Sequence, residues 1–159
     1  MVGGKETAFR KGESMSSGGI IVREAATSDV PAIAALCEEL GYPSSALDVE
    51  TRLIEIMKSA DHAVFVAVDR AVVGWIHVFL ALRMESDPFA EIGGLVISNN
   101  YRGRGAGRKL VLQCEEWTRS KQMSSLRVRS RLSRNDAHAF YLRLGFSEKK
   151  TQAVFDKTL

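Results

Sequence analysis

The sequence predicts an α/β domain in which a mixed sheet carries helices on its faces. Two observations predict this class. Segments with apolar residues at helical spacing alternate with short β-branched runs, and glycine, proline and capping residues mark the boundaries between them. The resulting order of elements is β-α-α-β-β-β-α-β-α-β-β. Such an order is typical of helices packed against a sheet in layers.

The length of 159 residues suits one hydrophobic core, so we expect a single domain over residues 20–159. Residues 1–19 are rich in glycine, show no periodicity and are expected to form a flexible leader. No apolar run reaches the roughly 20 residues that span a bilayer, and the N-terminus lacks the order of a signal peptide. We therefore expect a cytoplasmic protein without a membrane partner.

Charge and cysteine content narrow the partners further. The net charge is only +3, and a nucleic-acid-binding protein usually shows a denser basic stripe. Cys37 and Cys114 lie in helical patterns outside any CxxC spacing, which indicates buried thiols rather than a metal site. We expect no bound nucleic acid and no metal. The arginines that follow residue 101 favour an anionic small molecule.

The first half of the chain predicts one strand, two helices and a three-strand meander. Thr27-Ser28-Asp29 supplies capping oxygens before Pro31, and Gly41 ends the helix that begins there. A second helix is expected over 46–59. The strands are expected at 20–25, 63–68, 71–82 and 89–97, with Asp87-Pro88 as a break before the last of them.

The second half predicts a helix over 105–121 and an alternating strand over 126–131. Residues 133–136 are expected to cap a last helix that ends near Leu144, before Gly145. Two closing strands are predicted at 146–148 and 153–155.

The stretch from Glu91 to Arg108 joins a strand, a glycine-rich turn and the start of a helix. Free N–H groups, the helix dipole and arginine side chains all favour an anion there, and we interpret the turn as a pyrophosphate site. A Walker A loop is excluded because no Lys-Ser or Lys-Thr pair follows in place. A dinucleotide fingerprint is excluded because the turn follows the fourth strand and has the spacing GxGxG. A tight turn without a ligand remains an alternative.

Two segments resemble the signatures of the GCN5-related N-acetyltransferase family. Residues 102–107, RGRGAG, are similar to its R/Q-x-x-G-x-G/A motif and follow a Leu-Val-Ile strand. Residues 137–146, AHAFYLRLGF, are similar to its second signature of a helix and a strand. The resemblance extends over about residues 20–159. It implies a central sheet that splays open at the strand before the turn, and acetyl-CoA as co-substrate.

The resemblance also implies a set of cofactor-binding residues. The pyrophosphate would lie on the turn, and the pantetheine arm would pair with the preceding strand. Glycine permits the close approach of backbone to phosphate, and Gly93-Gly94 suits a bulge that begins the splay. The family often has an asparagine seven residues before its tyrosine. That position is Arg134 here, and Asn135 either takes its role or caps the last helix. The cofactor-binding set is Leu95, Val96, Ile97, Arg102, Gly103, Arg104, Gly105, Ala106, Gly107, Arg108, Arg134 and Asn135.

The reaction implied is direct attack of an amine on the thioester, without a covalent enzyme intermediate. The Val96 N–H is the expected donor to the oxyanion. Tyr141 matches the family's tyrosine and would protonate the leaving thiolate, its alternative role being to fill the core. Glu91 is the expected base, although a solvated glutamate is an equal alternative. His77 or a water chain are further candidates for the base.

The acceptor is expected to be a small-molecule amine, and a peptide or protein amine is the alternative. Acidic residues in two variable loops, Glu38, Glu39, Glu85 and Asp87, are candidates to receive a cationic amine or form a solvated face. Two other functions stay open. One is a non-catalytic acyl-CoA sensor, and the other is nucleic-acid binding through the alternating arginines of residues 127–131. Analogy with the family favours a homodimer.

Overall fold

The computed structural model describes residues 19–159 of the chain. The predicted leader, residues 1–19, therefore lies outside the described residues apart from Gly19. The strands are β1 (Ile21–Glu24), β2 (His62–Asp69), β3 (Ala71–Arg83), β4 (Ser86–Ile97) and β5 (Leu126–Val128). The helices are α1 (Val30–Glu39), α2 (Ala46–Met57), α3 (Ala106–Ser120) and α4 (Asn135–Arg143), with short 3₁₀ turns at Thr27–Asp29 and Asn99–Tyr101.

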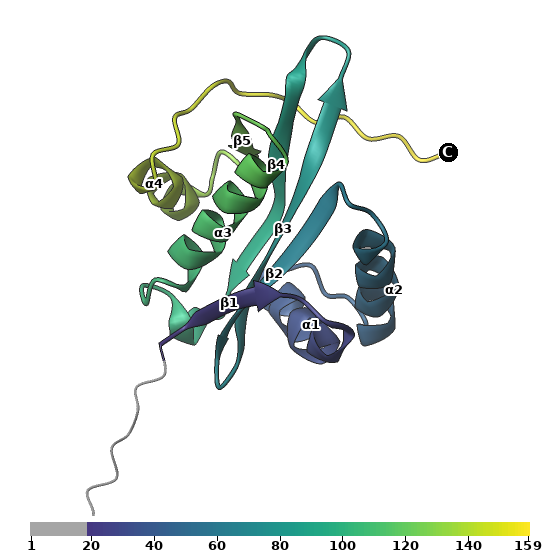
Figure 1. Cartoon of the computed structure of the whole chain (residues 1–159), viewed down its shortest axis with the longest axis vertical. Coiled ribbons are helices and arrows are strands. Elements are labelled where there is room, and N and C mark those ends of the chain that lie inside the picture. Colours follow the sequence, from purple (N-terminus) through teal and green to yellow (C-terminus); the bar gives the residue numbers. More distant parts are fainter. Residues whose placement is uncertain (1–18) are drawn as a thin grey trace, which may run out of the picture.

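The five strands form one sheet in the order β1-β2-β3-β4-β5. The first four are antiparallel neighbours, and β5 pairs with β4 in parallel, so the sheet is mixed as predicted. Helices α1 and α2 lie on one side of the sheet, and α3 lies on the other with α4 beside it (Figure 1). The predicted fold class is confirmed.

Each face of the sheet buries its own core. One face packs Ile76, Val78 and Ile92 against Leu110 and Cys114 of α3. The opposite face packs a smaller cluster under α1 and α2, formed by Ala25, Val30, Ile33, Val49, Leu53 and Val66. Side chains alternate across a strand, so the cluster to which one residue belongs shows which face of the sheet its neighbours along the strand occupy.

A bulge interrupts β4 at the predicted glycine pair. Val78 is paired with Ile92 and His77 with Gly94, so Gly93 is the extra residue. A Cβ on Gly93 would lie 2.9 Å from His77 Nδ1, and one on Gly94 would lie 2.9 Å from a Trp75 ring atom. Glycine is needed here because the side chains of β3 lie directly over the β4 backbone.

Several predicted boundaries were wrong. β4 begins at Ser86, because Pro88 falls where the β3–β4 register shifts and its missing N–H costs no ladder bond. β5 ends at Val128 rather than at residue 131. Within residues 19–159 no strand follows α4, so the strands predicted at 146–148 and 153–155 do not form. Strand propensity alone does not order a segment that has no neighbouring strand to pair with.

None of the helices in the described part of the chain is both long enough and apolar enough to span a membrane.

Candidate functional site

An open edge of β4 lies at the centre of the candidate site. β5 pairs with β4 only from Ala90 to Ile92. β4 continues to Ile97, and beyond Ile92 its outer edge has no neighbouring strand among residues 19–159. The two strands therefore part at Ile92, and the backbone groups that follow are free to pair with an extended ligand.

The strand register determines which backbone groups face this edge. Ser98 donates its N–H to the Val73 carbonyl at 2.8 Å, and Trp75 is paired with Val96. Because alternate pairs of an antiparallel ladder exchange hydrogen bonds, Val96 directs its N–H toward β3. The N–H and C=O groups of Leu95 and Ile97 face the open edge instead. The sequence-based choice of the Val96 N–H as oxyanion donor is therefore corrected.

The glycine turn continues from the open edge into α3. Gly103 has φ +76° and Gly105 has φ +85°, a left-handed conformation that non-glycine residues rarely adopt. Lys109 donates the first hydrogen bond of the helix, to the Gly105 carbonyl at 3.1 Å. The N–H groups of residues 106–108 thus precede the helical ladder and remain available to an anion.

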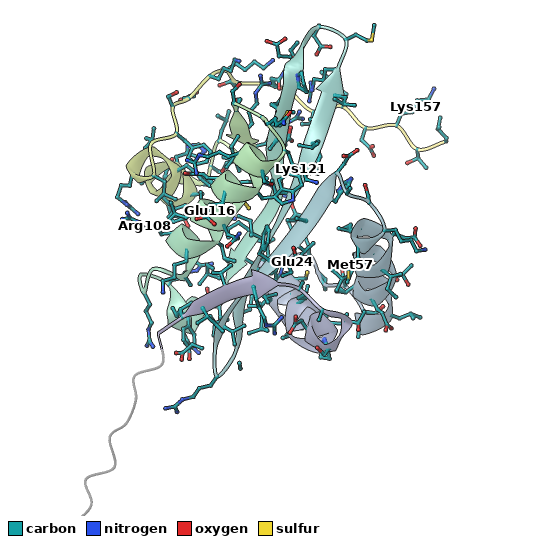
Figure 2. All side chains as sticks on the ribbon, viewed as in Figure 1. Glu24, Met57, Arg108, Glu116, Lys121 and Lys157 are labelled. Atoms are coloured by element: carbon teal, nitrogen blue, oxygen red, sulfur yellow. The ribbon has the colours of Figure 1, made fainter. Side chains whose placement is uncertain are left out.

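Arginine side chains surround this helix N-terminus. Arg102, Arg104 and Arg108 are exposed, and among residues 19–159 no carboxylate lies within ion-pair distance of any of them. Arg104 lies over the Tyr101 ring at 4.9 Å. Arg108 lies at the outer side of α3, on the same side of the molecule as α4 (Figure 2). Unpaired guanidinium groups at a helix N-terminus suit a pyrophosphate.

Gly107 has a different role from its neighbours in the turn. A Cβ at this position would lie 3.1 Å from the Phe140 ring. The glycine therefore lets the Phe140 ring of α4 pack against the start of α3. Sequence reasoning had assigned Gly107 to the phosphate contact alone.

Tyr141 lies between two aromatic rings, 5.2 Å from Phe140 and 5.4 Å from Phe146 between centroids. Burial raises the pKa of Tyr141 to about 12, although the nearby Arg134 guanidinium opposes the shift. The phenol therefore keeps its proton throughout the neutral range. A protonated, rigidly packed phenol has the properties of a general acid.

Glu91 is buried on the opposite face of the sheet from α3. Its neighbours Ala90 and Ile92 both belong to the core cluster under α3, so the glutamate points toward the α1 and α2 side. Its Oε1 atom forms an ion pair with Arg129 Nε at 3.0 Å. The side chain is thus a buried, ion-paired carboxylate beside the point where β4 and β5 part, rather than a solvated residue at the end of a strand.

His77 has a partner of its own. Its Nε2 atom lies 3.0 Å from Nδ1 of His62, and the two imidazole rings stack. The Phe79 ring stacks on His62 and is tilted against His77. Burial, with a contribution from His62, lowers the pKa of His77 to about 4. The ring is neutral at pH 7 and is a weak base.

Arg134 and Asn135 mark the start of α4. Arg134 occupies the N-cap position without a side-chain cap bond, and its Nε lies 3.4 Å from Asp136 Oδ1. Asn135 is the first residue of the helix, so it does not serve as the N-cap.

Two further contacts were missed by sequence reasoning. Glu39, at the end of α1, accepts a hydrogen bond from the Asn99 N–H at 3.0 Å and anchors α1 to the turn after β4. Tyr42, in the loop between α1 and α2, accepts a hydrogen bond from Arg131. Both pairs are far apart in sequence, so no local pattern could have revealed them.

Two of the cavities formed by residues 19–159 bear on the site. One of about 200 Å³ lies between α1, α2 and the sheet, and its lining includes Trp75 and His77, the residues that cover the β4 glycines. The other, of about 270 Å³, lies between the ends of α2 and α3 around Glu24, Met57 and Lys121 (Figure 2). Of these two, the first adjoins the bulge of β4, so it is the candidate acceptor cavity. No cluster of three His, Cys, Asp or Glu side chains suited to a metal occurs in the described region.

Comparison with known proteins identifies the family of the chain. Residues 29–146 match the model of the acetyltransferase (GNAT) family. The chain is 31% identical over 140 residues to an aminoglycoside N(6')-acetyltransferase type 1 of Stenotrophomonas maltophilia, with 84% of this chain and 90% of that protein covered.

Solved structures share the fold at lower identity. The 6'-N-acetyltransferase AAC(6')-Ih of Acinetobacter baumannii has a TM-score of 0.78 at 20% identity, covering 89% of this chain and 99% of that one. AAC(6')-Iy, solved with a bisubstrate analogue of CoA and acetylneamine, has a TM-score of 0.80 at 16% identity, covering 89% and 100%. We conclude that the chain belongs to the acetyltransferase (GNAT) family and is an enzyme of that class.

Proposed function

We propose that the protein transfers the acetyl group of acetyl-CoA to the amine of a small molecule. The observation that carries this proposal is the open edge of β4, which leads directly into an arginine-rich helix N-terminus. An extended pantetheine arm suits the first feature, and a pyrophosphate suits the second. The relative from S. maltophilia, named for acetylation of an aminoglycoside, supports a small-molecule acceptor.

In the proposed complex, the backbone groups of Leu95 and Ile97 pair with the pantetheine arm. The amides of residues 106–108 and the side chains of Arg102, Arg104 and Arg108 receive the pyrophosphate. The Leu95 N–H is the free donor nearest the point where the strands part, and we assign it to the developing oxyanion. Arg134, beside Tyr141, is proposed to face the cofactor from α4.

Proton transfers complete the reaction. The amine nitrogen attacks the thioester carbonyl, the amide bond forms, and the carbon–sulfur bond breaks. Glu91, directly or through water, takes the proton from the amine, and Tyr141 gives its proton to the departing thiolate. His77 is not proposed as the base, because its lowered pKa and its contact with His62 make it a poor acceptor.

Thiol release from acetyl-CoA across a panel of amines tests the function. We expect turnover with at least one small amine. Replacement of Arg102 or Arg108 by alanine should raise the KM for acetyl-CoA about tenfold or more, because each variant loses a charge-assisted hydrogen bond to the cofactor. Arg119→Ala is the matched control, since Arg119 lies on α3, as Arg108 does, but forms an ion pair with Glu115. Binding of acetyl-CoA without release of thiol for any amine would favour a sensor, and failure to bind it would refute the proposal.

A homodimer is also proposed. Val154 and Phe155 are 86% and 93% exposed, and they lie in a segment that finds no strand partner within residues 19–159. Pairing with a second copy would bury these side chains. Sedimentation equilibrium should then give the mass of two chains, and Phe155→Ser should shift it toward one. A one-chain mass for the unaltered protein would contradict the dimer.

A further inference from the structure

The loop between α1 and α2, residues 40–45, is tied to two distant segments of the chain. Glu39, just before the loop, accepts a hydrogen bond from the Asn99 N–H at 3.0 Å. Within the loop, the Tyr42 hydroxyl accepts a hydrogen bond from the Arg131 guanidinium. The first contact leads to the turn after β4, and the second leads to the segment after β5. The proposed acetyl transfer uses neither contact, so both need an explanation.

The two points of attachment lie on opposite sides of the gap between β4 and β5. Val128, the last residue of β5, is paired with Ile92, and among residues 19–159 the two strands form no further pair beyond this one. Asn99 follows the end of β4, whereas Arg131 lies beyond the end of β5. A chain segment that contacts both residues therefore spans the gap. This gap is the open edge of β4, where the thioester is proposed to lie.

The Tyr42–Arg131 bridge lies on the side of the sheet from which the amine approaches. Helices α1 and α2 and the loop between them cover the face opposite α3 (Figure 1). Glu91 points to the same face, and its carboxylate is the proposed base. An amine gives its proton to a group within hydrogen-bond reach, directly or through one water, so it must approach from the face that carries its base. The bridge thus borders the amine side of the reaction centre rather than the pyrophosphate turn.

The bridge can open without unfolding the loop. The Tyr42 side chain is exposed, with the Arg131 guanidinium 5.7 Å from its ring centre. The loop backbone is held independently of the side chain, because Tyr42 donates its N–H to the Cys37 carbonyl at 3.0 Å. An exposed hydrogen bond between a guanidinium and an uncharged phenol contributes little free energy, so rotation of the side chain alone can break it.

We propose that Tyr42, held by Arg131, is a positioning residue that closes the amine side of the reaction centre. With the bridge closed, the ring shields the thioester from water and keeps the amine in line with Glu91. With the bridge open, the acceptor enters and the product leaves. This inference rests on the proposed acetyl transfer and adds Tyr42 and Arg131 to it. Neither residue belongs to the pyrophosphate turn, so the KM for acetyl-CoA should not depend on the bridge.

Tyr42→Phe tests this role, because it removes the hydroxyl and keeps the ring. Thiol release is measured with the fastest amine of a panel that includes neamine, spermidine and benzylamine. We expect the KM for that amine to rise about 3- to 10-fold, as loss of one hydrogen bond predicts, with the KM for acetyl-CoA unchanged. Release of thiol without any amine should rise by a similar factor. An unchanged KM for the amine would overturn the positioning role, and unchanged amine-free release would exclude the shielding of the thioester.

Variants of Arg131 assign the effect to the bridge. Arg131→Met should raise the KM for the amine as Tyr42→Phe does, and Arg131→Lys, which keeps a charged donor, should restore part of the loss. The double variant Tyr42→Phe/Arg131→Met should have a KM for the amine no higher than that of either single variant, because both changes remove one contact. Arg119→Met is the control, since Arg119 pairs with Glu115 on α3. Effects that multiply in the double variant would show separate roles and overturn the bridge.

A measurement without turnover tests the bridge itself. The chain has three tyrosines, so fluorine nuclear magnetic resonance of protein labelled with 3-fluorotyrosine gives one resonance for each. The Tyr42 resonance, identified by its loss in Tyr42→Phe, should move toward that of free 3-fluorotyrosine in Arg131→Met and stay in place in Arg119→Met. A resonance that does not move in Arg131→Met would overturn the bridge.

These outcomes distinguish the inference from the proposed function. If no amine is acetylated, the proposed function fails, and the positioning role of Tyr42 fails with it. Amine-dependent turnover with an unchanged KM for the amine in Tyr42→Phe and Arg131→Met would overturn the positioning role alone and leave the proposed function intact.

Discussion

Replacement of Tyr141 by phenylalanine separates catalysis from packing at this position. The change removes only the hydroxyl and keeps the ring contacts with Phe140 and Phe146 at 5.2 and 5.4 Å. A general acid contributes about 10²–10⁴-fold to rate, which is about 2.7–5.5 kcal/mol of barrier. We therefore expect kcat to fall by at least about 100-fold, with little change in the KM for acetyl-CoA or in thermal stability.

The pH dependence gives a second, independent test of the same residue. The pKa of Tyr141 is raised by burial to about 12. At pH 10 about 1% of such a phenol is ionised, whereas about half of a phenol with an ordinary pKa is ionised. Unmodified enzyme should therefore keep its acid-dependent activity at pH 10, measured by loss of thioester absorbance over a short time course. A Tyr141→Phe enzyme within twofold of the parent, or an activity midpoint near pH 10, would refute the role as acid.

Two further predictions concern the core and the glycine turn. The pKa of His77 is about 4 in the folded protein, below its ordinary value, so the unfolded chain binds more protons between these two values. The free energy of unfolding should therefore fall by up to about 3 kcal/mol as the pH drops from about 6.5 toward 4, as measured by urea unfolding. His77→Gln should lose most of this dependence, whereas His138→Gln, at a half-buried histidine of α4, should retain it. A parent equally stable at pH 7 and 4.5 would contradict this prediction. Gly105→Ala, at φ +85°, should cost about 1–2 kcal/mol and also raise the KM for acetyl-CoA. Gly41→Ala is the control, because Gly41 has φ +88° and equally open space around it. This variant should lose the same free energy of unfolding but keep the parent's KM for acetyl-CoA. Equal KM values for the two variants would exclude the turn from cofactor binding.

The sequence by itself determined the fold class, the four helices and the glycine-rich turn before α3. These features rest on local patterns: apolar periodicity sets each element, and glycines at fixed spacing permit the left-handed turn before α3. The bulge at Gly93-Gly94 was predictable for the same reason, since glycine within a strand departs from β propensity. Fold class and family followed from these segments.

Only the tertiary structure decided how individual groups in the site are directed. The register with β3 turned the Val96 N–H away from the open edge and left that of Leu95 free. The ion pair with Arg129 showed that Glu91 is an oriented carboxylate, whereas the sequence alone left a solvated glutamate as an equal alternative.

The same distinction applies to the arginines of residues 127–131 and to the C-terminal segment. In the sequence the arginines form an alternating basic run that is compatible with several ligands. In the structure they contact Phe89, Glu91 and Tyr42, which come from distant parts of the chain, and these contacts set where each guanidinium lies. The C-terminal residues have strand propensity, but no strand forms after α4 within residues 19–159. Local sequence sets what each segment can form, whereas contacts between distant segments set which backbone edges are paired and which charges remain uncompensated.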